Sequence, residues 1–143
     1  MKLQIKKLNQ DAVLPQKATE NSAGYDLYAN VKMPIKINKN ETIKIPTGIA
    51  MAFSSEYVGL IFARSSLATK FSIAPANCVG VIDSDYRGEI IVALKNNGEE
   101  PYEISPNERI AQFLLMPVCT FDIEEVSILD ETVRGSGGFG STN

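Results

Sequence analysis

The sequence of 143 residues contains no histidine and no tryptophan. Without histidine, the chain alone cannot build a Ser-His-Asp triad, a Cys-His protease site, or a zinc or iron site with histidine ligands. The same absence excludes a zinc deaminase of the His/Cys/Cys type. Acid–base chemistry in this chain must therefore come from groups other than imidazole.

Cysteine and long apolar segments are also scarce. Cys78 and Cys119 form no CxxC motif, so a structural zinc site or a thioredoxin-type motif is not supported. We expect two reduced, buried thiols in a cytosolic protein. The sequence has no signal-peptide core and no run long enough to span a membrane, so we expect a cytoplasmic location, or a nuclear or organellar one in a eukaryote.

Arginine is the scarcer basic residue, and the charges are unevenly distributed. The 14 basic residues include only four arginines, Arg64, Arg87, Arg109 and Arg134. Arginine is preferred where a carboxylate or phosphate is held by two parallel hydrogen bonds, so each is a candidate anion contact. The net charge of −3 argues against general binding of nucleic acid. Residues 1–45 are basic and residues 97–143 acidic, which fits either solvated faces or head-to-tail contact between copies.

Short strand patterns separated by turn residues recur along the whole chain, and helical periodicity is weak. We expect an all-β fold, a jelly-roll-like β-barrel or sandwich, with one short helix over 65–70 and Ser65 as its N-cap. Residues 1–133 should form the domain, and 134–143 a flexible glycine-rich tail of that domain. The expected strands are 3–8, 33–37, 42–45, 48–53, 57–63, 79–82, 89–94, 110–118 and 123–129.

The tail resembles two nucleotide-binding patterns without satisfying either. Its glycines match GxGxxG, and Ser141 stands where a P-loop would need lysine. Both motifs need a preceding strand and a following helix, and we expect no helix after these glycines. The glycine-rich backbone can still wrap a phosphate, with Arg134 as a clamp and Phe139 stacking on a base. A merely solubilising tail is the alternative.

Four other segments could carry chemistry. In 77–91, Asp83 follows an apolar run in an apparent hairpin, where a carboxylate at the mouth of a dry slot suits a general base. In 63–68, Arg64 and two serines at a helix start could bind an anion. Asp26 lies in a glycine-containing turn, and Gln112 interrupts an apolar strand. Each feature also has a plain structural explanation, but together they suit phosphoryl transfer without histidine.

These segments resemble the five ordered motifs of the homotrimeric dUTPases, a family with a jelly-roll-like β fold. The matching stretches are AGYDL (23–27), ARSSLA (63–68), NCVGVIDSDYRG (77–88), ERIAQF (108–113) and RGSGGFGST (134–142). One departure is Ala63, where the family usually has proline; we expect a change in loop rigidity and no loss of function. The resemblance implies hydrolysis of dUTP to dUMP and pyrophosphate, which lowers dUTP and supplies dUMP for thymidylate synthesis.

The resemblance also assigns roles to individual residues. Asp83 would activate the water that attacks the α-phosphorus, and Tyr86 would pack on deoxyribose and exclude a 2′-hydroxyl. Asp26 would contact the hydration shell of one Mg²⁺ held mainly by the triphosphate. Uracil would be read by Asn77, Gly80, Val81, Ile82 and Ile91. The phosphates would be held by Arg64, Ser65, Ser66, Gln112 and Arg134, while Phe139 stacks over uracil and Gly140 and Ser141 also contact the substrate.

The family's assembly and two competing functions complete the expectation. Each site would use three chains of a homotrimer, with dUTP as the ligand and no nucleic acid or membrane as partner, and Arg87 and Arg109 would be structural or interface residues. A dCTP deaminase has the same fold, but the position of its general-base glutamate is Ala93 here. A non-catalytic nucleotide sensor would have lost Asp83 and Tyr86, which are present.

Overall fold

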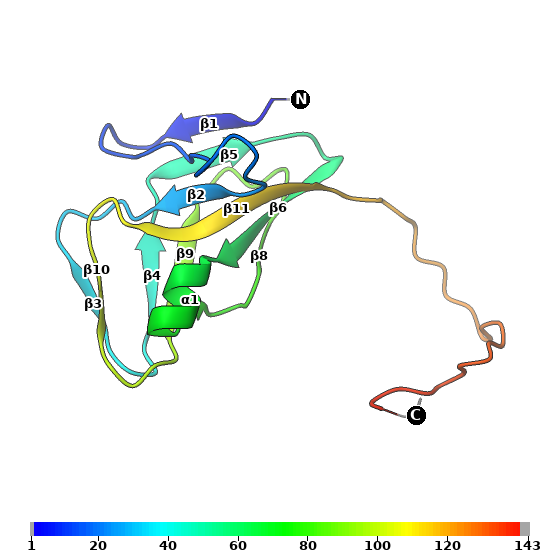
Figure 1. Cartoon of the computed structure of the whole chain (residues 1–143). Coiled ribbons are helices and arrows are strands. Elements are labelled where there is room, and N and C mark those ends of the chain that lie inside the picture. The colour runs from blue at the N-terminus through cyan, green and yellow to red at the C-terminus, as the bar shows by residue number, and fades with distance from the viewer. Residues whose placement is uncertain (1, 141–143) are drawn as a thin grey trace.

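Strands and one short helix account for the regular structure in residues 2–140, the part of the chain that the computed structural model describes (Figure 1). The strands are β1 (Gln4–Lys7), β2 (Tyr25–Tyr28), β3 (Ile35–Ile37), β4 (Thr42–Pro46), β5 (Ile49–Ala52), β6 (Tyr57–Ala63), β7 (Ile73–Pro75), β8 (Gly80–Ile82), β9 (Ile91–Asn96), β10 (Tyr102–Ile104) and β11 (Arg109–Pro117). The helix, α1, spans Ser65–Phe71.

The strands pair antiparallel, and most neighbours in a sheet are distant in sequence. One sheet has the order β2-β11-β6-β8 and a second the order β4-β9-β7, while β1-β5 and β10-β3 form two smaller ladders. This order, with connections that cross between sheets, is typical of jelly-roll sandwiches. The expected all-β, jelly-roll-like fold is confirmed, and the sheets of the described residues do not close into a barrel.

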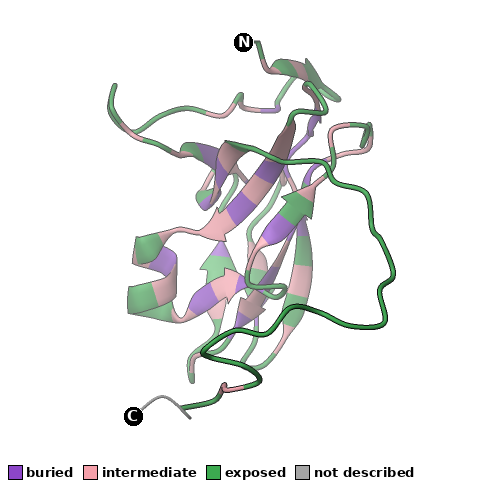
Figure 2. Ribbon diagram, turned by 90° about the vertical axis from the view of Figure 1, so that its right-hand side faces the viewer, coloured by how far each residue is buried: buried purple, intermediate pink, exposed green. Residues whose placement is uncertain are grey.

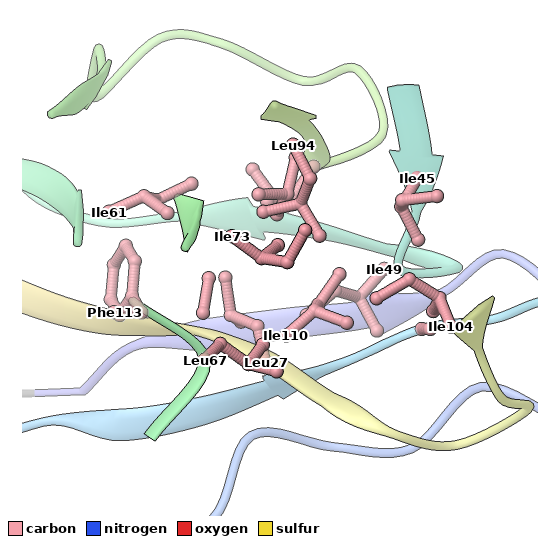
Figure 3. Packing of buried hydrophobic residues seen from close by; sticks show 14 of the residues in the cluster. Leu27, Ile45, Ile49, Ile61, Leu67, Ile73, Leu94, Ile104, Ile110 and Phe113 are labelled. Carbon is pink, nitrogen blue, oxygen red and sulfur yellow. The ribbon is translucent and has the colours of Figure 1, made fainter. Parts of the chain in front are cut away.

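The core lies between the sheets and follows from the two-residue period of the strands (Figure 3). On β9, Val92, Leu94 and Asn96 are buried, whereas Ile91 is 45% exposed on the opposite face. On β11, the buried Phe113 packs near Ile61 of β6, and Gln112 turns outward. The same alternation that builds the core therefore directs Ile91 and Gln112 to the surface.

The short strands β7 and β10 were not predicted. Two other strand predictions were wrong for opposite reasons. AGYDL was interpreted as a turn, but residues 25–28 form β2, because β11 supplies a partner strand in which Gln112 lies opposite Asp26. Residues 123–129 were predicted as the last strand, but they form none. Ile123 is 91% exposed and Ile128 84% exposed, so no other part of the described chain covers these apolar side chains.

Three local predictions also need correction. The N-cap of α1 is Arg64, not Ser65, and no side chain caps the helix. Cys78 and Cys119 are free, as expected, but both are exposed. Residues 83–88 do not connect a β-hairpin, because β8 pairs with β6 whereas β9 pairs with β4 and β7. The 83–88 turn instead joins two different sheets, which leaves an open space between β8 and the start of β9.

The last part of the chain leaves the body after β11 and extends away from it (Figure 1). The described residues after β11 are exposed almost throughout, as the green trace shows (Figure 2). In the described range, the seven-residue α1 is the only helix, far shorter and less apolar than a membrane-crossing helix must be.

Candidate active site

A groove lies between β8 and the beginning of β9. Its outer part has a volume of about 180 Å³ and is lined by Val81, Ile82, Asp83, Tyr86, Glu89 and Ile91. Its inner part has a volume of about 110 Å³ and is lined by Ile61, Pro75, Asn77, Gly80, Val81, Ile82, Ile91, Val92 and Ala93. We call these two adjacent parts, which share Val81, Ile82 and Ile91, the β8–β9 groove. It brings together the residues of the 77–91 segment that were expected to contact the substrate, namely Asn77, Gly80, Val81, Ile82, Asp83, Tyr86 and Ile91.

The 83–88 turn borders the groove and is closed by hydrogen bonds within itself. The Tyr86 amide donates to the Asp83 carbonyl over 3.1 Å, and the Arg87 guanidinium donates to the carbonyls of Ser84 (2.7 Å) and Tyr86 (3.1 Å). Asp83 comes directly after β8 and is exposed in the isolated chain. The carboxylate therefore stands at the mouth of the groove, but one chain alone does not provide the dry slot that we expected around it.

A second cluster is centred on Asp26, a carboxylate that is only 7% exposed. Arg64 donates from Nε to Oδ1 over 2.9 Å, and Arg109 donates from Nη1 to Oδ2 over 3.2 Å. Arg64 Nη1 also donates to the Arg109 carbonyl over 3.2 Å. Because two of its nitrogens are occupied in this way, Arg64 is held firmly, and its Nη2 is the remaining nitrogen for an anion.

Tyr102 and Glu108 lie on the strand and turn beside this cluster. The Tyr102 hydroxyl donates to Glu108 Oε1 over 2.5 Å, and the Ser105 amide donates to Glu108 Oε2 over 2.9 Å. Burial, and secondly this hydrogen bond to a carboxylate, raise the pKa of Tyr102 well above its usual value. Tyr102 also packs against Phe71 at the end of α1, with ring centroids 4.8 Å apart. The helix end and the beginning of β11 are thereby fixed to each other.

Three further candidates lie near Arg64. Ser65 and Ser66 form the first turn of α1, immediately after β6, where their backbone amides lack helical partners. Gln112 lies opposite Asp26 on β2 and opposite Phe62 on β6. Its Oε1 is packed so closely on Gly24 that a Cβ there would approach it to 2.9 Å. Three of the sequence motifs therefore meet at the Asp26 cluster.

The tail residues lie apart from both the groove and the Asp26 cluster. Arg134 donates from Nε to the Gly137 carbonyl over 2.9 Å, and the Gly137 amide donates back to the Arg134 carbonyl over 3.1 Å. Phe139 is fully exposed, and no atom outside the immediate chain lies within 4 Å of a Cβ built on Gly135 or Gly140. Ser141 lies outside the described residues.

The described chain thus holds the candidate residues in three separate places. No hydrogen bond or ion pair among residues 2–140 links the β8–β9 groove to the Asp26 cluster, or either of them to Arg134 and Phe139. Nor do these residues contain a group of three cysteine or acidic side chains that could hold a metal ion. Sequence reasoning missed Glu89 in the groove, whose only signal was its position after Gly88.

Comparison with known proteins identifies the family. The chain matches the family model described as dUTPase over residues 10–143. It is 50% identical to a deoxyuridine 5′-triphosphate nucleotidohydrolase of Desulfitobacterium hafniense over 130 residues, which cover 90% of this chain and 86% of the relative. A protein of the same name from Acinetobacter baumannii is 42% identical over 147 aligned positions, covering 99% and 98%. The chain belongs to the dUTPase family.

Solved dUTPases share the fold as well. A mutant dUTPase of Staphylococcus bacteriophage 80alpha, solved with dUpNHpp, superposes with a TM-score of 0.89 at 26% identity and covers 98% of this chain and 97% of its own. The enzymatic activity expected from the five motifs, hydrolysis of dUTP, is therefore confirmed at the level of the family. The roles of individual residues are a separate question.

Proposed function

We propose that this dUTPase converts dUTP to dUMP and pyrophosphate with Asp83 as the general base. The observation that supports this most is the position of Asp83 at the mouth of the β8–β9 groove, directly after β8. With a nucleoside bound in the groove, the α-phosphate would project through that mouth and lie beside the Asp83 carboxylate. The reaction would lower dUTP and supply dUMP for thymidylate synthesis.

The proposed chemical step needs only a positioned water and a base. The water oxygen forms a bond to the α-phosphorus as one of its protons passes to Asp83. The bond from the α-phosphorus to the oxygen that bridges to the β-phosphate breaks, and pyrophosphate leaves with that oxygen. General-base assistance typically contributes about 10²–10⁴-fold, and the correct placement of the two reactants contributes further.

In this proposal the groove selects the nucleoside. Asn77, the backbone of residues 80–82 and Ile91 line the inner part, where they would read the edge of uracil and leave no room for a 5-methyl group. Tyr86 in the outer part packs on deoxyribose and excludes a 2′-hydroxyl. Specificity would thus come from shape on one side and from hydrogen bonds on the other.

The phosphates would be bound by the Asp26 cluster. Arg64 offers Nη2, while the helix start with Ser65 and Ser66 and the outward side chain of Gln112 offer further donors. Asp26 already receives two guanidinium groups, and the described residues contain no three-ligand metal group, so this chain does not fit a resident metal ion. Mg²⁺ would arrive on the triphosphate as part of the substrate, with Asp26 reaching only its hydration shell.

The tail would close the site from another subunit of a homotrimer. Arg134 would bind the γ-phosphate, Phe139 would stack over uracil, and Gly140 and Ser141 would complete the lid 134–143. The separation of groove, Asp26 cluster and tail within one chain supports sites shared between subunits, as do the opposite charges of residues 1–45 and 97–143.

A deaminase is the second candidate on the same fold, and one observation weighs against it. Ala93, the residue that aligns with a deaminase's glutamate base, lines the inner part of the groove. A carboxylate at this position would face the nucleobase and could act as a general base, whereas the methyl group of Ala93 cannot transfer a proton. The groove of this chain therefore favours hydrolysis at phosphorus over chemistry on the base.

Product analysis distinguishes these functions. The enzyme is incubated with Mg²⁺ and, separately, dUTP, dCTP, dTTP and UTP, and the products are separated. Selective release of dUMP and pyrophosphate from dUTP is expected. Release of ammonia from dCTP, or equal turnover of dUTP and dTTP, would contradict the proposal.

Site sharing can be tested by mixing two inactive variants. Asp83→Asn chains keep the tail, and chains lacking residues 134–143 keep Asp83, so a mixed trimer can assemble an intact site from both. If groove and tail come from different chains, random mixing restores about a quarter of the wild-type activity. No recovery, with mixed oligomers verified by size and mass, would contradict shared sites.

A further inference from the structure

Contacts at its hydroxyl, its backbone amide and its ring fix the position of Tyr86. Its hydroxyl donates to the Glu89 carbonyl over 3.0 Å, and its amide donates to the Asp83 carbonyl over 3.1 Å. The ring also lies directly on Gly88, since a Cβ there would collide with the Tyr86 hydroxyl and stand 2.6 Å from Cζ. Because 43% of Tyr86 is exposed, these contacts and not burial define where the ring stands.

Glu89 connects this ring to a rigid part of the core. The Gly48 amide donates to Glu89 Oε1 over 2.7 Å. The next residue is fastened to the same turn, because the Ile90 carbonyl accepts from the Thr47 amide (3.2 Å) and hydroxyl (2.5 Å). Gly48 has φ +69° and sits so close to Ala12 that a Cβ would approach it to 2.8 Å. The carbonyl that receives the Tyr86 hydroxyl therefore has little freedom to move.

We propose that Glu89 is a positioning residue for sugar selection: by anchoring its own backbone to Gly48, it holds Tyr86 where a 2′-hydroxyl would stand. The inference rests on the proposed role of Tyr86 against deoxyribose. Steric exclusion is only as strict as the excluding group is fixed, because a ring that can rotate away admits the larger sugar. Glu89 thus acts on discrimination without touching the sugar itself.

The decisive quantity is the ratio of kcat/KM for dUTP to kcat/KM for UTP. Glu89→Ala removes the anchor to Gly48, and the ratio should fall about three- to tenfold, as expected from the loss of one hydrogen bond. UTP turnover should rise relative to dUTP turnover. Glu89→Gln keeps an oxygen that accepts from Gly48 and should preserve the ratio. Glu103→Ala, which removes an exposed carboxylate from β10, is the matched control.

Two further variants keep the test independent of how well Glu89→Ala folds. Tyr86→Phe retains the ring and removes only the hydroxyl that donates to the Glu89 carbonyl, so it should lower the dUTP/UTP ratio to a similar extent. The double variant Tyr86→Phe/Glu89→Ala should fall no further than the larger single effect, because both changes break one connection. Gly88→Ala should lower the ratio at least as far by displacing the ring.

The outcomes separate this inference from the proposed function. If the wild-type enzyme shows no preference for dUTP over UTP, the role of Tyr86 itself is wrong. If the wild-type enzyme discriminates but Glu89→Ala keeps the ratio, or if the effects of Tyr86→Phe and Glu89→Ala add, the role of Glu89 is overturned while hydrolysis of dUTP stands.

Discussion

Removing the carboxylate of Asp26 should affect both stability and substrate binding, because the two arginines around it depend on it. In Asp26→Ala, Arg64 loses a charge-assisted hydrogen bond of 2.9 Å at a side chain that is only 19% exposed. Such a bond contributes about 1.5–3 kcal/mol. The bond to Arg109 is longer, and that side chain is 48% exposed, so it adds at most about 1 kcal/mol.

The expected destabilisation is therefore about 2–4 kcal/mol, most of it from the unpaired Arg64. For a domain of this size it corresponds to a decrease in Tm of about 6–12 °C. Thermal unfolding followed by circular dichroism measures this, with all variants at one protein concentration, because the Tm of the proposed homotrimer would depend on that concentration. Asp122→Ala, which removes an exposed carboxylate from the segment between β11 and the tail, is the control.

The same variant should raise KM for dUTP more than it lowers kcat, because Arg64 would no longer be held toward the phosphates. Asp26→Asn, which retains one acceptor oxygen, should lie between the wild-type enzyme and Asp26→Ala in both measurements. A decrease in Tm below about 2 °C would refute the energetic reasoning on this ion pair. If Asp26→Ala shows the expected destabilisation but an unchanged KM, the Asp26–Arg64 ion pair only stabilises the fold, and its role in placing Arg64 for substrate binding is refuted.

Three other predictions concern the base, the tail and Tyr102. Asp83→Asn should lower kcat by about 10²–10⁴-fold with dUTP binding retained, whereas Asp85→Asn in the same turn should not; equal effects on kcat would sink the assignment of the base. Deletion of 134–143 should abolish turnover without changing the number of subunits in the oligomer, and an active truncated enzyme would refute the lid. Tyr102→Phe should cost about 1 kcal/mol near pH 8 by freeing Glu108. Folding raises the pKa of Tyr102 from its ordinary value of 10.0, so the stabilisation by the Tyr102 hydroxyl is lost as the pH rises above 10.0. The difference in free energy of unfolding between the wild-type enzyme and Tyr102→Phe, measured with denaturant, should therefore narrow. A difference that stays constant with pH would contradict this.

The sequence predicted the strands that have a run of apolar residues several positions long, bounded by turn residues. Strand β6 was predicted over its full length, 57–63, because its apolar residues are continuous and turn residues flank it. Strand β2 was missed because its residues resemble a turn locally. It forms because β11, more than 80 residues later, supplies hydrogen bonds and Arg109 supplies a charge for Asp26.

Contacts between distant segments were the part that the sequence could not provide. Arg64 was assigned to phosphate from its residue type, its place at a helix start and the family resemblance, but its fixed position depends on Asp26, 38 residues away. The importance of Glu89 depends on its bond to Gly48, 41 residues away. Residues 123–129 were predicted as a strand from their apolar residues, but a strand also needs a partner, and the described residues offer none.

The detached tail can also be regarded as a ligand on a tether. About 16 residues, 118–133, separate the end of β11 from Arg134, and fully extended they reach no further than about 55 Å. Each residue removed would shorten that reach by about 3.4 Å. Once the segment is too short to span the distance to the site, the effective concentration of the tail there would fall to near zero. Each residue added would cost only a little closure entropy. The segment should therefore tolerate insertions far better than deletions, although nothing in its own conformation distinguishes the two.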